Sequence, residues 1–281
     1  MFFEVLELEF MQRAIIAGVA VAITSSVIGL FLVLRRNSLF GDALSHAAFG
    51  GIAVGLAANV YPLWTGLMLS ILGALGITKL RQSAKIPADA AVAILLSSGL
   101  ALGILLISLS SGFTLDLFSF LFGSILLVSI EDTLAILAMT GIVLSIVILL
   151  YRQLMYITFN EEQARVSGLP ISQLNYLFIV LASVAVIISM RLVGILLVSS
   201  LIVIPNITAL LFSKGFKKTA LISLSLSVFS VVAGIIISYA VNLAPAGTIV
   251  LVSTGMFLIV FCSRHYSKRK QIGEKLEEAR S

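Results

Sequence analysis

The chain of 281 residues is 60% hydrophobic and only 11% charged, with a mean hydropathy of +1.17. An average soluble domain is roughly 45–50% apolar and about 25% charged, so the composition excludes a soluble enzyme, a disordered chain and a disulfide-stapled secreted domain. The single Cys262 permits no intramolecular disulfide. We therefore expect the lipid bilayer as the surrounding solvent. Membrane proteins carry an excess of Lys and Arg in their cytoplasmic loops, so the formal charge of +5 does not indicate that the chain binds nucleic acid.

The apolar pattern predicts an all-α fold, a polytopic integral membrane protein with eight or nine transmembrane helices. A helix needs about 20 mostly apolar residues to cross the hydrocarbon core. The predicted spans cover residues 12–34, 40–59, 62–80, 88–109, 133–151, 171–190, 192–212, 219–241 and 246–263. The first span lacks a signal-peptide cleavage pattern and is expected to stay attached.

Segment 113–130 is apolar but short, and Asp116 and Gly123 interrupt it. It is predicted to be a short re-entrant or interfacial helix and not a further span. Asp116 is interpreted equally well as a cap of that helix or as a gating residue on the outer side.

Lys and Arg residues are distributed unevenly between the predicted loops. With nine spans, all 18 of them except Arg13 and Arg191 fall on one side of the membrane. Positive loops mark the cytoplasmic side. We therefore expect a multi-pass protein of the cell (plasma or inner) membrane, with a transmembrane domain at 1–263 and a cytoplasmic basic tail at 264–281.

Asp42 and His46 are the most informative charged pair within a predicted span. They are four residues apart and so share one helix face. A carboxylate and an imidazole in this arrangement suit zinc or manganese. The alternative, given equal weight from spacing alone, is that Asp42 caps the helix and His46 bonds a backbone carbonyl.

Further polar residues lie along the fourth and seventh predicted spans. Asp89 follows Pro87 and is interpreted first as a helix-starting residue, with a transport role as the alternative. Other candidates for a polar pathway are Ser97, Ser98, Pro205, Asn206 and Thr208. Serines in spans often bond their own backbone. A proline inside a span is expected to kink or unwind the helix.

Residues 160–168 form the clearest helix signal in the aqueous loops. Asn160 is a good N-cap, Glu161 and Glu162 suit the first turn, and Gly168 provides a stop. Such a helix of about two turns is too short to be stable alone. It is interpreted either as an ordinary structured loop or as a coupling helix gripped by a soluble motor subunit.

Four segments together resemble the permease subunit of the ABC-type zinc/manganese importers, and the resemblance covers nearly the whole chain. They are GDALSHAAFGGIA after a basic RR pair, DLFSFLFGSIL, NEEQARVSGLP and RLVGILLVSSLIVIPNITA. The resemblance implies that Asp42 and His46 face the translocation path as metal ligands. It also implies that the 160–168 helix, including Ala164 and Arg165, contacts an ATPase.

The resemblance further implies three protein partners: a second copy of the chain, a cytoplasmic ATP-binding subunit and an extracytoplasmic metal-binding protein. Asp42 and His46 from two copies would supply the four ligands that zinc prefers. The chain has no G-x-x-x-x-G-K-[ST] phosphate loop, so we expect no ATPase site of its own. Transported Zn²⁺ or Mn²⁺ is expected as cargo, with no permanently bound cofactor.

Two details bear on the cargo and the pathway. Manganese-type members often carry a proline in the second-span motif; the AAFGGIA stretch has none, which favours zinc, with manganese next. The family usually reads P-A-A-T-A where this chain has Asn206.

Three other functions remain as alternatives. They are a secondary metal transporter, an ABC permease for a metal chelate, and an intramembrane aspartyl protease using Asp42 and Asp89.

Overall fold

The computed structural model describes residues 8–109, 120–123, 129–195, 197–212 and 214–278, and the regular structure within these ranges is entirely helical. The helices are α2 (Glu9–Leu34), α3 (Phe40–Ala57), α4 (Pro62–Ala84), α5 (Ala88–Leu109), α7 (Ile130–Leu149), α8 (Tyr151–Phe159), α9 (Glu161–Val166), α10 (Ile171–Val193), α11 (Val198–Leu210), α12 (Phe216–Val241) and α13 (Pro245–Glu278).

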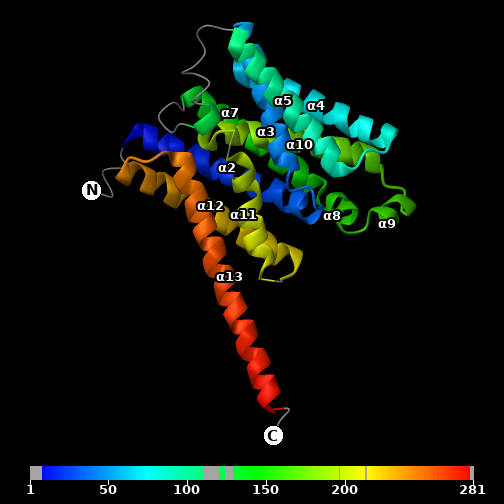
Figure 1. Ribbon diagram of the computed structural model, residues 1–281, viewed down its shortest axis with the longest axis vertical. Coiled ribbons are helices and arrows are strands. Elements are labelled where there is room, and N and C mark those ends of the chain that lie inside the picture. The colour runs from blue at the N-terminus through cyan, green and yellow to red at the C-terminus, as the bar shows by residue number, and fades with distance from the viewer. Residues whose placement is uncertain (1–7, 110–119, 124–128, 196, 213, 279–281) are drawn as a thin grey trace.

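Eight of the described helices are long and apolar enough to cross a membrane, which confirms the polytopic all-α fold. The predicted span 192–212 contains only the shorter helix α11, of 13 residues. At about 1.5 Å per residue this helix is about 20 Å long, less than the roughly 30 Å of hydrocarbon, so the nine-span orientation requires the segment before α11 to complete this crossing. Helix α13 continues past the predicted domain boundary at 263 as one helix and extends beyond the bundle (Figure 1).

The chain unwinds between α10 and α11 at Gly194, which has φ +74°. There the backbone meets Gly123, at φ +70°, so closely that a Cβ on Gly194 would lie 2.5 Å from the Gly123 nitrogen. The Ile195 N–H also donates to the Phe120 carbonyl at 2.9 Å. The unwinding expected at Pro205 is therefore found at Gly194, since α11 continues through Pro205. Most of segment 113–130, including Asp116, lies outside the described residues.

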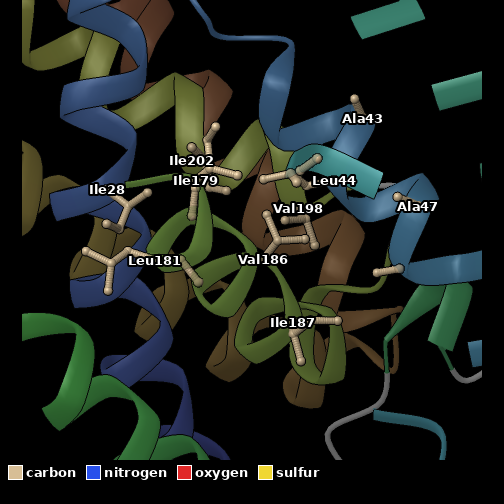
Figure 2. Close-up of a cluster of buried hydrophobic side chains, with 14 of the residues drawn as sticks. Ile28, Ala43, Leu44, Ala47, Ile179, Leu181, Val186, Ile187, Val198 and Ile202 are labelled. Atoms are coloured by element: carbon tan, nitrogen blue, oxygen red, sulfur yellow. The ribbon is translucent and has the colours of Figure 1, made fainter. Parts of the chain in front are cut away.

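Helix α10 lies inside the bundle and contributes to both of its main hydrophobic clusters. One cluster joins α10 to α3 and α2 through side chains such as Leu44 and Ile28, both fully buried (Figure 2). The other joins it to α12 and α13 through residues such as Ile235 and Ile249. This packing fixes α3 against the rest of the bundle.

Helix α2 adds polar contacts to this apolar core through the consecutive residues Thr24, Ser25 and Ser26. Successive helix residues are about 100° apart, so three in a row can face three neighbours. Their side chains form 3.0 Å hydrogen bonds with Thr140 of α7, Ser189 of α10 and Ser223 of α12, respectively. In a membrane, such bonds contribute about 0.6 kcal/mol each on average.

Candidate metal site and cytoplasmic surface

Glycine contacts place α3 tightly between α4 and α5. A Cβ on Gly99 of α5 would lie 2.5 Å from the His46 carbonyl oxygen, and one on Gly51 would lie 2.6 Å from the Thr65 carbonyl of α4. Small residues permit such close helix crossings. The glycines of α3 therefore allow close contacts with other helices of the same chain. The crossing of α3 and α5 lies at the helical turn that carries His46.

The structure brings Asp42 and His46 together on α3. The His46 Nε2 lies 3.9 Å from the Asp42 Oδ1, and the two side chains are 13% and 28% exposed, respectively. Zinc binds nitrogen and carboxylate oxygen at about 2.1 Å, so two atoms that share one ion can lie no more than about 4.2 Å apart. The observed separation therefore admits one shared ion between these atoms.

Neither structural alternative for this pair is found. The N-cap of α3 is Leu39, and no side chain forms a cap hydrogen bond there, so Asp42 does not cap the helix. The His46 Nδ1 is buried and has no hydrogen-bond partner among the described residues. A buried nitrogen without a partner costs about 1–3 kcal/mol. Packing therefore does not account for the buried His46 nitrogen, whereas Asp42 lies in the first turn of α3, where a carboxylate stabilises the helix N-terminus.

One chain supplies an incomplete coordination sphere. Among the described residues, no group of three or more His, Cys, Asp or Glu side chains could hold a metal ion. Structural zinc sites have four ligands and catalytic ones have three plus water. A metal ion at this pair would need further ligands from water or from another chain.

The other predicted pathway residues of α5 differ in their surroundings. Asp89 is exposed in the first turn of α5, where a carboxylate stabilises the helix N-terminus. Ser97 and Ser98 are exposed, and Ser98 donates to the Leu95 carbonyl at 3.1 Å. These serines immediately precede Gly99 and so lie beside the crossing with His46.

The predicted pathway residues of α11 are buried between helices. Asn206 is fully buried; its Nδ2 donates to the Ile202 carbonyl and its Oδ1 accepts from Ser223 of α12, both at 2.7 Å. Thr208 donates to the Ile204 carbonyl at 2.7 Å, and Pro205 is buried beside them. Hydrogen bonding and packing satisfy the polar groups of Asn206 without a pathway role.

Helix α9 begins and is anchored as its sequence predicts. The Asn160 side chain accepts a hydrogen bond from the Gln163 N–H at 3.0 Å. Ala164 is fully buried against a small apolar cluster, whereas Val166 is 90% exposed. Gly168 follows at φ +78°, a left-handed conformation that favours glycine. The helix thus presents its outer side to solvent while one residue holds it to the bundle.

Arg35 joins the end of α2 to α8 and α10. From the sequence, it is interpreted only as one of the basic residues that mark the cytoplasmic side. Its Nε donates to Thr158 of α8 at 3.0 Å, its Nη1 donates to Asn175 of α10 at 2.9 Å, and its guanidinium lies 4.5 Å from the Phe178 ring centroid. Burial lowers the pKa of Arg35 from its ordinary value, while the negative charge of Glu161 opposes that shift. No local sequence signal predicts these partners, because they lie more than a hundred residues along the chain.

The model of the ABC 3 transport family matches residues 7–264. The chain belongs to the ABC 3 transport family. This confirms the resemblance drawn from the four motifs, and with eight candidate spans it makes the chain a multi-pass permease of the cell membrane.

Individual members of the ABC 3 transport family are similar over almost the full length. A probable metal transport system membrane protein of Treponema pallidum is 36% identical over 91% of this chain and 96% of its own. The manganese transport system membrane protein MntC of Listeria monocytogenes is 34% identical over 91% of each chain. The solved structure of PsaBC from Streptococcus pneumoniae in complex with Fab matches with a TM-score of 0.86 at 32% identity, covering 96% of this chain and 98% of that one.

Proposed function

We propose that this permease imports a divalent transition metal ion into the cytoplasm and that Asp42 and His46 bind the ion on its way. The observation that carries the proposal is the geometry of the pair. The two ligand atoms are 3.9 Å apart on α3, and the buried His46 Nδ1 has no hydrogen-bond partner among the described residues. Imidazole and carboxylate ligands suit manganese and zinc.

Manganese is the proposed cargo, with zinc as the alternative. The absence of proline from the AAFGGIA stretch favours zinc. The relative from Listeria monocytogenes, however, is named as a manganese transport system membrane protein. One histidine and one carboxylate do not discriminate between the two ions, so the functional name of a relative covering 91% of the chain has more weight.

A second copy of the chain is the proposed source of the remaining ligands. Two ligands from each of two symmetric copies would complete a four-ligand site on the two-fold axis. The exposed serines at Ser97 and Ser98, beside the α3–α5 crossing, would then face the partner near the ion.

The proposed protein partners are a cytoplasmic ATP-binding subunit and an extracytoplasmic metal-binding protein. Helix α9 is the proposed contact with the ATP-binding subunit, because its Val166 is 90% exposed while Ala164 is buried. The distribution of basic residues favours a cytoplasmic position for α9 and the C-terminal tail. ATP hydrolysis belongs to the partner, since the chain has no phosphate-loop motif.

The experiment that tests the proposal is ATP-driven manganese uptake by proteoliposomes containing the permease and its ATP-binding subunit. We expect His46→Ala to lower uptake at limiting manganese at least about tenfold, because loss of even an outer-shell partner costs about 10–100-fold in metal affinity. Ser225→Ala is the matched control, since this exposed hydroxyl bonds only its own helix at the Leu221 carbonyl.

Unchanged uptake by the His46→Ala protein would overturn the site assignment. Uptake that needs no ATP would instead favour a secondary metal transporter. Measuring zinc uptake and manganese uptake in the same proteoliposomes shows which of the two ions the permease prefers.

A further inference from the structure

A cavity of about 940 Å³ lies among the ends of α2, α4, α8 and α10, on the side of the bundle that holds the basic loops. It is separate from the Asp42–His46 pair, which is not among its lining residues. Four basic residues line it, from three segments of the chain: Arg35 after α2, Arg81 and Lys85 at the end of α4, and Arg165 on α9.

The positive charge in this cavity is only partly neutralised. Glu161 is the one acidic residue that lines it, and its carboxylate lies 3.6 Å from Arg165. Arg81 and Lys85 are solvent-exposed and form no ion pair with a described residue. Arg81 and Lys85 therefore have no ion-pair partner in the described part of the chain, and Arg35 has only the longer-range charge of Glu161, which is already paired with Arg165.

Arg35 gives the clearest sign of a missing ligand. Its Nε and Nη1 are bonded to Thr158 and Asn175, but its Nη2 is buried and has no partner among the described residues. A buried donor of a charged group without an acceptor is costly, and an anion in the cavity would supply that acceptor. Guanidinium groups match phosphate oxygens in geometry and charge.

The cavity also has an apolar wall, which includes Leu32, Ile77, Phe178 and Ile179. A cavity that joins several cations to such a wall fits an amphiphile better than a small ion. The cytoplasmic leaflet is rich in anionic lipids, and basic pockets between helices on that side bind lipid head groups.

We propose that this cavity binds a phosphate group through Arg35, Arg81 and Lys85, presented by an anionic phospholipid or by a soluble phosphate. The proposed phosphate ligands do not include Asp42 or His46. It would tie the cytoplasmic ends of α2, α4 and α10 together and, through Glu161 and Arg165, adjoin α9.

The test uses the full-length permease and native mass spectrometry after purification with either phosphatidylglycerol or phosphatidylcholine. We expect selective retention of phosphatidylglycerol. The double variant Arg81→Gln/Lys85→Gln should weaken it about thirty-fold, equivalent to about 2 kcal/mol for two basic residues. The matched control is Arg36→Gln/Lys217→Gln, which removes the same charge from exposed residues that do not line the cavity.

A second arm measures binding of inorganic phosphate to delipidated permease by equilibrium dialysis, with the same variants. Loss of binding in the Arg81→Gln/Lys85→Gln protein but not in the control variant supports the site. Loss of phosphatidylglycerol binding identifies a lipid as the phosphate source, and loss of inorganic phosphate binding identifies a soluble phosphate. Equal loss in the control variant, or no binding in both arms, would overturn the proposal. Neither readout depends on transport, so failure of the metal assignment would leave this test unaffected.

Discussion

His46 differs from many polar residues of the bundle in having a buried nitrogen without a described partner. Several buried hydroxyls donate to a backbone carbonyl one turn earlier, as Ser183 and Ser189 do at 3.0 Å and 2.7 Å. Such contacts satisfy a side chain without giving it a function. His46 has no such bond at its buried Nδ1, and it lies one helical turn from a carboxylate. That contrast makes the pair the candidate site.

Asn206 shows the opposite case, a polar residue that packing accounts for. We predict that Asn206→Ala lowers the free energy of unfolding by about 1 kcal/mol, since two buried hydrogen bonds are lost, to Ile202 and Ser223. Thermal unfolding in detergent should show a loss of a few degrees, about 2–4 °C. Ser225→Ala, on an exposed face, should show none. Normal thermal stability together with loss of manganese uptake would instead place Asn206 on the pathway.

Residue-level prediction from sequence succeeded where the signal is local. The i, i+4 spacing of Asp42 and His46 and the Asn160 cap are both set within one turn, and the structure contains both arrangements. The hydrogen-bond partners of Arg35 and Asn206 could not be predicted in this way. Their partners, such as Asn175 and Ser223, come from other helices, and helix packing determines which residues meet.

At the scale of helices, α9 depends on contacts at its two ends. It has only six residues, far fewer than the 12–15 or so that an isolated helix needs. Its N-terminus is capped by Asn160, and near its C-terminus the buried Ala164 holds it to the bundle. A helix held in this way can transmit force from a partner only while both contacts persist.

We predict that Asn160→Ala lowers ATP-driven uptake by up to about fivefold while leaving manganese binding unchanged. Loss of an N-cap costs about 1 kcal/mol, which is a factor of about five in the ratio of ordered to disordered helix. Asn160→Asp is the matched control, because aspartate caps equally well. The comparison is made by measuring uptake and equilibrium metal binding on the same preparations. An Asn160→Ala protein with full uptake would exclude a coupling role for the capped helix.

Helix boundaries were predictable from hydropathy except near α11. The span 192–212 is continuously apolar, so composition could not reveal that Gly194 unwinds it. The contact that accompanies the break is the close approach to Gly123, which lies in a different segment of the chain. Long apolar runs therefore locate spans well and interruptions within them poorly.

For the whole molecule, the distribution of basic residues predicts which end of the bundle faces the cytoplasm. Arg35, the Arg81–Lys85 segment and Arg165 lie far apart in sequence but line one cavity, which agrees with their assignment to a single side. Helix α13 extends past the rest of the bundle in Figure 1, and its basic residues predict that this end is cytoplasmic.

Cysteine labelling tests this orientation. In a Cys262→Ser background, we predict that an impermeant maleimide labels Ala58→Cys in intact cells, because this exposed residue follows α3 on the outer side. Ser83→Cys and Tyr266→Cys, both exposed, should react only after permeabilisation. The reverse pattern would invert the predicted topology.

The central claim is that Asp42 and His46 from two copies bind one transported ion, and the most direct measurement is metal stoichiometry. Isothermal titration of manganese into the purified permease complex in nanodiscs should give one tightly bound ion for every two permease chains. The Asp42→Ala/His46→Ala protein should bind none with comparable affinity, since each chain contributes only these two ligands among its described residues. One ion per chain, or the same tight binding in the double variant, would contradict the account.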